Sequence, residues 1–405
     1  MTVRGLKPET VAWVVLWTAF GVFLLLCTGT ILAVRWFIQS ATVTEEAQLT
    51  VTGGTVAIRP LSQGSPDWVV APPQATLEES DQVRTDEGST AFIRLPDGST
   101  VSVLPGTELA ISRLRRFRFG EPGHLLDITI KSGRLILGVA HPIGRPTAFR
   151  ILSGGAEVQL AEGNYAVRKE ADRLEVRVRQ LGSALVRSGP FEVNLGSLQR
   201  AVAYPGRLEG PLPPEDDLIR AGDFTQGLDD RAWQPVVEEA CWAAPQVQNR
   251  LEPTRVDGEQ AVRFFRQGSE GTPCQMFLHQ EVNRDISDLI SLRLKIEFRI
   301  DRQTLSGGGY LGSEYPVQVR MLYRGADGGE RVWVRGFYIQ NVEGRRTDHG
   351  VKVEGDRWVE YWVPDAEDPN LLTLAGGVRY IRWIEVMASG HDFESYVRRV
   401  SLLGQ

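Results

Sequence analysis

The sequence predicts a mainly β protein in which one N-terminal transmembrane helix holds two β-rich domains. Residues 11–34 carry no charged side chain, as expected of a membrane-spanning segment. Most of the remaining chain consists of short runs that alternate apolar and polar residues, which is the period of a half-buried strand. The 42 Gly and 22 Pro supply tight turns between these runs. With 405 residues, the chain is long enough for two or three domains with separate cores.

The uncharged segment would be roughly 36 Å long as a helix, which is enough to cross a bilayer with some tilt. No small-residue cleavage site follows it, because the next residues are Arg35-Trp36-Phe37. We therefore expect an uncleaved anchor over residues 11–38. Arg4 and Lys7 precede this anchor, which favours a cytoplasmic tail of residues 1–10. The bulk of the chain is then extracytoplasmic, on a single-pass protein of the cell membrane.

The cysteines are compatible with that location. Cys27 lies in the membrane segment, whereas Cys241 and Cys274 are able to form a disulfide in an oxidising compartment. Two buried thiols would give the same sequence, so both alternatives stay open. Neither cysteine belongs to a metal-ligand motif, and we expect no metal site.

Composition and motifs argue against two classes of function. A net charge of -6 lacks the basic excess that phosphate backbones attract, so nucleic acid is not an expected partner. The five histidines are scattered, and no serine-nucleophile motif is present. Acidic neighbours such as Glu238-Glu239 are better interpreted as exposed charge than as a glycosidase pair. We therefore expect no enzyme activity and no cofactor.

The first β domain is expected over residues 39–204. Gly53-Gly54 and Asp97-Gly98 each separate two alternating runs. Both pairs predict hairpins, because these residues supply the positive φ angles of tight turns. The alternation that continues beyond them predicts an antiparallel or coiled sheet.

Residues 47–190 contain an ordered series of motifs, namely Asp81-Gln82-Val83-Arg84-Thr85, Gly88-Ser89-Thr90-Ala91, Leu95-Pro96-Asp97-Gly98-Ser99-Thr100-Val101, Leu104-Pro105-Gly106-Thr107-Glu108-Leu109, Ile128-Thr129-Ile130-Lys131-Ser132-Gly133 and Leu181-Gly182-Ser183-Ala184-Leu185-Val186. This series resembles the FecR domain, the extracytoplasmic module of a family of bacterial signal-transducing membrane proteins. It departs from the family at Ser80, where Gly is usual, and at Asn164, where a Gly-Thr pair is usual. The resemblance implies a sensory or scaffolding module.

The best-known members of that family regulate a sigma factor through a cytoplasmic N-terminal region. Here the expected cytoplasmic tail, residues 1–10, is too short to form a core of its own. Direct sigma-factor control is therefore not expected of this chain.

Proline and acidic residues concentrate in residues 205–217, which predicts a linker. The strand-length runs of residues 218–405 predict a two-sheet sandwich. The opening Ala221-Gly222-Asp223-Phe224-Thr225-Gln226-Gly227-Leu228 resembles the start of a galactose-binding-like jelly roll, the fold of many carbohydrate-binding modules. Arg398 or Arg399 stands where that family often has a carboxylate, which argues against the structural calcium that the resemblance would imply.

Aromatic residues of the second domain are the candidate ligand-binding residues, because a flat π face stacks on a sugar ring while nearby polar groups bond its hydroxyls. A sandwich also packs many aromatic side chains inward, and that alternative applies to each candidate. Residues 306–315 contain G-x-G-x-x-G without a following helix, so they predict a binding rim or flexible loop and not a nucleotide site. The candidates are Trp242, Trp333, Tyr338, Trp358, Trp362 and Trp383, with Tyr310 and Tyr315 in the glycine-rich segment.

A basic run extends from Arg113 to Phe119. It suits contact with anionic polysaccharide or lipid headgroups. The alternative is an edge strand that its charges protect against pairing with other chains.

Together these features predict a membrane-anchored extracytoplasmic binding or sensory protein that recognises carbohydrate through its sandwich. A structural or protein-interaction component of the cell envelope is the alternative. A sigma-factor regulator or a glycan-active enzyme fits the sequence less well.

Overall fold

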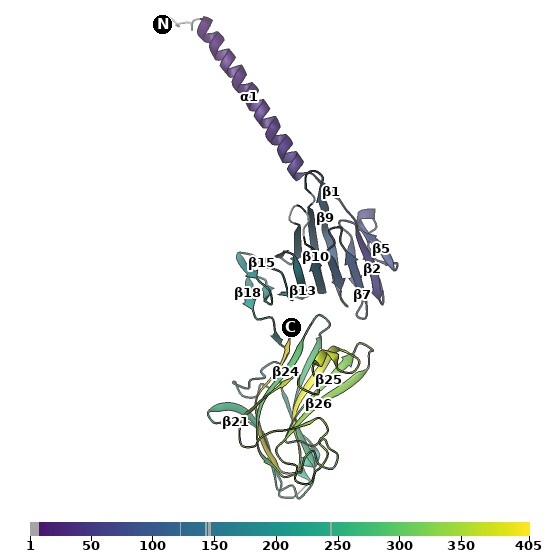
Figure 1. The fold of residues 1–405 in the computed structure, drawn as a ribbon, viewed down its shortest axis with the longest axis vertical. Coiled ribbons are helices and arrows are strands. Elements are labelled where there is room, and N and C mark those ends of the chain that lie inside the picture. The colour runs from purple at the N-terminus through teal and green to yellow at the C-terminus, as the bar shows by residue number, and fades with distance from the viewer. Residues whose placement is uncertain (1–7, 122, 142–143, 145–146, 244) are drawn as a thin grey trace. The chain divides into compact units, whose positions relative to one another are not determined.

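The computed structural model describes residues 8–121, 123–141, 144, 147–243 and 245–405. Helix α1 (Pro8–Ser40) is the first described element and contains the whole predicted anchor, residues 11–38 (Figure 1). From Val15 onward this helix is long and apolar enough to cross a membrane. Arg4 and Lys7 lie outside the described residues. Contacts divide the chain into two units, residues 1–212 and 213–405.

The first unit contains β1 to β18, which belong to one network of backbone pairings. Their bounds are β1 (Thr42–Thr44), β2 (Ala47–Gly53), β3 (Val56–Arg59), β4 (Val69–Val70), β5 (Gln74–Leu77), β6 (Gln82–Thr85), β7 (Thr90–Arg94), β8 (Thr100–Val103), β9 (Glu108–Phe117), β10 (His124–Val139), β11 (Ala148–Ser153), β12 (Ala156–Leu160), β13 (Gly163–Glu170), β14 (Arg173–Val178), β15 (Ala184–Ser188), β16 (Phe191–Leu195), β17 (Arg200–Tyr204) and β18 (Arg207–Leu212).

These pairings form two sheets that share the long strand β10. The first half of β10 pairs with β9 and β11, and the second half pairs with β8 and β13. One sheet therefore has the order β4-β3-β6-β9-β10-β11-β12-β15-β16. The other has the order β5-β2-β7-β8-β10-β13-β14-β17-β18. Buried Leu49, Ile128 and Tyr165 belong to the common apolar core.

The two predicted hairpins have different outcomes. The one at Asp97-Gly98 is confirmed, because β7 and β8 pair directly and Asp97 accepts hydrogen bonds from Ser99. The one at Gly53-Gly54 is wrong, because β2 pairs with β5 and β7 whereas β3 pairs with β4 and β6. Gly54, at φ 67°, instead carries the chain from one sheet into the other, packed so closely on Ser89 that a Cβ would lie 2.3 Å from its Oγ.

The basic run Arg113 to Phe119 lies mainly in β9. This strand pairs with β10 on one side and with β6 and β1 on the other, so the interpretation as an edge strand is wrong. The run alternates because one face of β9 packs on the core, as Leu114 does, while the other face points away from it.

The second unit contains β19 to β30, arranged as two sheets with the orders β21-β22-β30-β24-β28 and β20-β23-β29-β25-β26-β27. The short β19 joins the first of them through β30. The bounds are β19 (Asp216–Asp217), β20 (Gln234–Val237), β21 (Gln248–Val256), β22 (Glu259–Gln267), β23 (Cys274–Asp285), β24 (Leu292–Gln303), β25 (Val317–Gly325), β26 (Glu330–Tyr338), β27 (Gly350–Lys352), β28 (Val359–Val363), β29 (Val378–Gly390) and β30 (Phe393–Gly404).

Apolar side chains from both sheets of the second unit form one core, with Phe298 and Phe337 at a ring distance of 4.3 Å. The predicted fold class, mainly β with one N-terminal helix and a C-terminal β-sandwich, is confirmed. The described residues also include three short 3-10 turns, namely Leu61–Gln63, Glu239–Trp242 and Leu371–Thr373.

The range predicted as a linker, residues 205–217, contains two strands. β18 pairs with β17 of the first unit, and β19 pairs with β30 of the second. Pro211 lacks the backbone N–H that a central strand needs. It fits in β18 because, among the described strands, this strand pairs only with β17 and has a free edge on its other side. The boundary between the units falls between Leu212 and Pro213.

Candidate ligand-binding site

One face of the sheet β20-β23-β29-β25-β26-β27 points away from the sandwich core. On β23, Met276 and Leu278 are core residues, so Phe277 and His279 between and beyond them point outward. The same alternation on β25 and β29, the two central strands, leaves four further side chains on the outer face. The resulting group is named the Trp383 cluster and consists of Phe277, His279, Arg320, Leu322, Trp383 and Glu385.

Strand register places the charged members of this cluster in one row. His279 is opposite Glu385 across β23 and β29, and Glu385 is opposite Arg320 across β29 and β25. Nδ1 of His279 lies 3.1 Å from Oε1 of Glu385, and Nε of Arg320 lies 3.5 Å from Oε2. Glu281 contacts the other ring nitrogen of His279, also at 3.1 Å. An imidazole and a guanidinium thus flank the buried carboxylate of Glu385.

Trp383 lies in the neighbouring row, opposite Leu322 of β25. Its ring centroid is 5.6 Å from that of His279, and the Arg320 guanidinium is 5.9 Å from it. Leu322 is in turn opposite Val332 of β26, which is 46% exposed. The centre of this face therefore combines an accessible apolar surface with adjacent charged hydrogen-bonding groups.

Gln318 adds an acceptor to the same face. It lies in register with Met387 of β29 and Gly336 of β26, and its side chain is 5% exposed. Among the described residues, no group donates a hydrogen bond to its Oε1. A buried carbonyl oxygen without a partner costs about 1–3 kcal/mol, so this side chain is a local source of instability in the sheet.

The glycine-rich segment, residues 306–315, borders this face at β26 and β27. Tyr315 fixes it there, because a Cβ on Gly336 would lie 2.0 Å from the tyrosine ring and one on Gly350 would lie 2.6 Å from its hydroxyl. That hydroxyl is 2.8 Å from the carbonyl oxygens of Gly312 and Asp348, and burial raises the pKa of Tyr315. Tyr310 in the same segment is 83% exposed. Strand β25 follows the segment, so its G-x-G-x-x-G has no helix N-terminus to bind a phosphate.

Three other aromatic candidates of this sheet and its loops have distinct environments. Trp333 is buried on the inner face of β26, where its Nε1 donates to Asp368 Oδ2 at 2.7 Å. The ring faces of Trp333 and the buried Tyr315 are therefore closed to a ligand in this structure. Tyr338 is half-buried, with its ring stacked 6.2 Å from that of Tyr315. Trp242 is 58% exposed at the end of a 3-10 turn beside the disulfide.

Trp362 lies instead in β28 of the other sheet, and Trp358 directly precedes that strand, where charged groups already pair with one another. Trp362 packs under Arg293 and Lys295, at 5.0 and 5.3 Å, and donates to Glu360. Trp358 lies under Arg398 at 4.7 Å and donates to Asp257. A cationic side chain lies over each of these half-buried rings, as Arg320 does over Trp383.

The same sheet explains how Arg398 replaces the expected carboxylate. Its Nε donates to Glu297 at 2.7 Å and its Nη1 to Glu259 at 2.9 Å. A cation is thus supplied by the chain itself at this position. Within the described parts of the chain, no group of three or more His, Cys, Asp or Glu side chains is placed to hold a metal ion.

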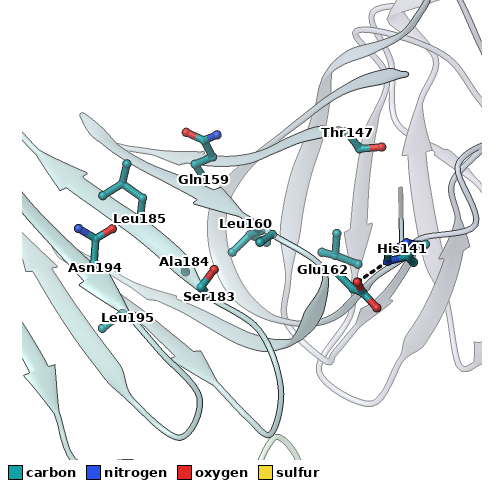
Figure 2. A pocket seen from close by; sticks show the side chains of 13 residues that line it. His141, Thr147, Gln159, Leu160, Glu162, Ser183, Ala184, Leu185, Asn194 and Leu195 are labelled. Carbon is teal, nitrogen blue, oxygen red and sulfur yellow. Dashed lines mark hydrogen bonds and ion pairs between the residues drawn. The ribbon is translucent and has the colours of Figure 1, made fainter. Parts of the chain in front are cut away.

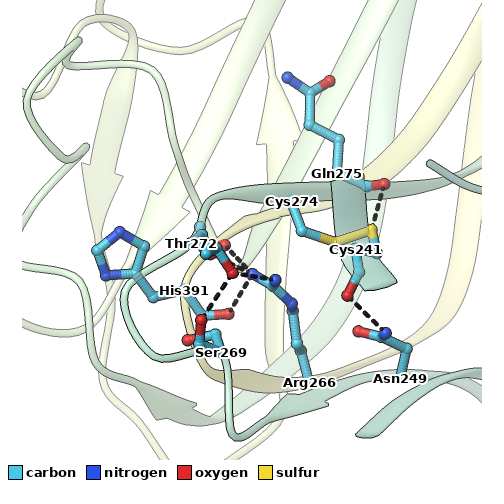
Figure 3. The surroundings of a disulfide bond; sticks show 9 residues. Cys241, Asn249, Arg266, Ser269, Thr272, Cys274, Gln275 and His391 are labelled. Atoms are coloured by element: carbon cyan, nitrogen blue, oxygen red, sulfur yellow. Dashed lines mark hydrogen bonds between the residues drawn. A yellow bond between two sulfur atoms is a disulfide. The ribbon is translucent and has the colours of Figure 1, made fainter. Parts of the chain in front are cut away.

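Cys241 and Cys274 form a disulfide with their Cα atoms 4.7 Å apart (Figure 3). The bond joins the turn that carries Trp242 to the start of β23. Beside it, the buried Arg266 donates to the carbonyl oxygens of Thr272, Gly390 and His391. Burial lowers the pKa of Arg266, and the charge of Asp392 opposes that shift. The disulfide and these hydrogen bonds hold the neighbouring turns together at this end of the sandwich.

The first unit contains an open cavity of about 530 Å³ (Figure 2). Leu160, Ala184 and Leu195 form its apolar part, and an exposed pair, His141 and Glu162, lies at 2.6 Å on one side. Figure 2 also shows the polar side chains of Thr147, Gln159, Ser183 and Asn194 among the lining residues, so the described lining is of mixed polarity.

Sequence reasoning named Trp383 but missed His279, Arg320 and Glu385 as a group. The alternation of each strand was visible, yet the three residues lie on three different strands. Only the sheet order β23-β29-β25 brings them into one row.

The comparison with family models matches residues 81–180 to the FecR protein family. A search of curated proteins gave no significant match. Among solved structures, a candidate anti-sigma factor from Parabacteroides distasonis is 21% identical, with a TM-score of 0.26. That match covers 32% of this chain, which spans 56% of the length of the matched protein.

Carbohydrate-binding modules form a second set of similar structures. The family 11 module of a Clostridium thermocellum cellulase is 12% identical, with a TM-score of 0.28, and the match covers 47% of this chain and 95% of the module. A family 28 module specific for non-crystalline cellulose is 11% identical, with a TM-score of 0.26 and coverage of 45% and 91%. The family match overlaps most of the ordered motifs, and residues 81–180 of this chain are a FecR domain.

Proposed function

We propose that this protein is a membrane-anchored, extracytoplasmic binding protein that recognises carbohydrate through the Trp383 cluster. Helix α1 is the anchor, its N-terminus is cytoplasmic, and both β units lie outside the cell membrane. The FecR domain then stands between the membrane segment and the ligand-binding sandwich in the chain. The role contains no catalytic step.

The observation that carries the proposal is the Trp383 cluster itself. A sugar ring has an apolar C–H face and a rim of hydroxyls. Trp383 and Leu322 offer the apolar surface, while His279, Arg320 and Glu385 lie beside it with charged hydrogen-bonding groups. Aromatic stacking combined with such polar contacts suits a carbohydrate better than a purely apolar ligand.

The disulfide supports the extracytoplasmic location, because such bonds persist in oxidising compartments.

The test uses the full chain reconstituted in nanodiscs and applied to a glycan array, followed by calorimetric titration of the glycans that bind. Trp383→Ala should raise the Kd about tenfold or more. Loss of the stacking ring should cost about 1.4 kcal/mol of binding free energy or more, and about 1.4 kcal/mol corresponds to a tenfold change in Kd. Trp362→Ala is the matched control, because it removes a tryptophan from the opposite sheet.

Equal weakening by both variants would reject the Trp383 cluster as the site. A folded chain that binds no glycan would reject carbohydrate recognition and favour a structural or protein-interaction role in the envelope. Near-ultraviolet circular dichroism of each variant separates lost binding from lost folding.

A further inference from the structure

The turn between β9 and β10 lies next to the place where the chain leaves helix α1. β1 begins two residues after the helix ends at Ser40, and it pairs antiparallel with the end of β9, Thr42 opposite Phe117. The ladder continues past the strand, because the Arg118 N–H donates to the Ala41 carbonyl at 2.9 Å. The residues after Phe117 therefore lie at the level of the last turn of α1.

A contact between aromatic rings also places the turn after β9 beside the end of α1. The ring of Phe119 lies 6.2 Å from that of Phe37, which belongs to the apolar segment Val15–Ser40. Phe119 is nevertheless 38% exposed, and Trp36 and Phe37 of the helix are 70% and 53% exposed. Aromatic rings in this position have an apolar part and an edge that favour the membrane–water interface.

The charges of this turn suit an anionic surface. The preceding cations of β9 are paired, Arg113 with Asp127, Arg115 with Glu79 and Arg116 with Glu45. Arg118 differs, because among the described residues it has no carboxylate partner and lies 5.4 Å from the Phe119 ring. The exposed Glu121 is the opposing charge in the same turn.

We propose that residues Phe117–Glu121 form a second membrane contact, in which Phe119 enters the interface and Arg118 binds the phosphate of an anionic phospholipid. The partner is the same bilayer that α1 crosses, since the β1–β9 register holds this turn against the end of the helix. The inference rests on the proposed anchor. Two points of attachment restrain the tilt and rotation of the FecR domain on the membrane, which a single helix followed by a flexible stretch would not do.

The experiment places a nitroxide on the full chain with Cys27→Ser, at Phe119→Cys or at Leu181→Cys, in nanodiscs with and without phosphatidylglycerol. Leu181 is the matched control, because it is 71% exposed and lies at the other end of β10 from Phe119. It is next to Gly163, which pairs with Val139 at the end of that strand. Collision rates with oxygen and with a water-soluble nickel complex report depth. Position 119 should favour oxygen, and position 181 should favour nickel.

The charge is tested with Arg118→Glu and, as its control, Arg94→Glu, an exposed cation opposite Thr100 near the far end of β10. Phosphatidylglycerol should raise the oxygen preference at position 119, and Arg118→Glu alone should abolish that rise. Equal nickel access at both positions in a chain that co-purifies with nanodiscs would overturn the second contact while leaving the anchor intact. Failure to co-purify would overturn the anchor and this inference together, whereas glycan binding is measured separately.

Discussion

Trp333 donates a hydrogen bond from Nε1 to Oδ2 of Asp368 at 2.7 Å. Nη2 of the fully buried Arg335 lies 2.6 Å from the same oxygen and 3.1 Å from Oδ2 of Asp365. Both β26 side chains point into the sandwich, and both carboxylates come from the loop after β28. This network ties that loop to the core and gives Trp333 a structural role.

Replacement of Trp333 by Ala should therefore unfold the sandwich more readily. Loss of a buried tryptophan and its hydrogen bond should lower the free energy of unfolding by about 3–5 kcal/mol. Trp362→Ala, on an outer face, should lower it by about 1 kcal/mol or less. Guanidinium unfolding followed by circular dichroism measures both, and equal losses would contradict the assignment of Trp333 to the core.

Acid should weaken the sandwich through its paired carboxylates. Burial alone would raise the pKa of Asp365, but hydrogen bonds from Tyr361 and from the Asp368 backbone, with the charge of Arg335, hold it below its usual value of 3.8. Burial likewise acts on Glu297, whose pKa Lys295 and Arg398 hold below 4.5. Between the folded and the unfolded pKa values of these carboxyl groups, the unfolded chain therefore binds more protons than the folded chain.

The sign of the pH effect follows from these lowered pKa values. The stabilisation is fully present above the unfolded pKa and is lost as the pH falls below about 4 and through the folded values. Guanidinium midpoints measured between about pH 7 and about pH 3 should fall only at the acidic end. Asp365→Asn should flatten part of that decline, and an unchanged profile would show that this carboxylate does not contribute.

Replacement of Ser80 by glycine should raise the stability of the folded chain. It has φ 86°, and its N–H donates to the Ile111 carbonyl, while the next residue, Asp81, accepts from the N–H groups of Ser62 and Glu78. A left-handed conformation costs an L-residue roughly 1–2 kcal/mol, and glycine avoids this cost. Glycine also loses more backbone entropy on folding, which offsets roughly 0.5–1 kcal/mol of the stabilisation.

Ser80→Gly should therefore raise the stability of the first unit by about 0.5–1 kcal/mol, whereas Ser80→Ala should give no gain. Thermal unfolding of the full chain measures both variants. A loss of stability with glycine would mean that the Ser80 side chain contributes more than its conformation costs.

Local sequence signals predicted individual elements better than their partners. Asp97-Gly98 and its flanking alternation were enough for the β7–β8 hairpin, because both strands lie in one sheet. Gly53-Gly54 has the same local signal, but β2 and β3 diverge into different sheets. Turn chemistry specifies a change of chain direction and does not specify which strands pair across it.

The candidate site shows a similar limit. Trp333 and Trp383 both occur in alternating strands, yet one points into the core and the other outward. Alternation groups residues by face, and only the packing of the two sheets decides which face is buried. His279, Arg320 and Glu385 are moreover joined by non-local pairing, which one strand's sequence does not contain.

Gly336→Ala should loosen the rim of the candidate site. An added Cβ would lie 2.0 Å from Cδ2 of Tyr315, so the ring that fixes residues 306–315 must move. Overpacking of this kind should lower the free energy of unfolding by about 1–3 kcal/mol. Proteolysis near the exposed Tyr310 should also become faster, because the segment loses its anchor.

A double-mutant cycle separates this contact from a general effect on β26. Once Tyr315→Ala has removed the ring, Gly336→Ala should cost little, since its Cβ then meets no aromatic atom. Strong non-additivity between the two substitutions is therefore the expected result. Additive losses would place the effect of Gly336 in the strand itself and leave the glycine-rich segment without the proposed dependence on Tyr315.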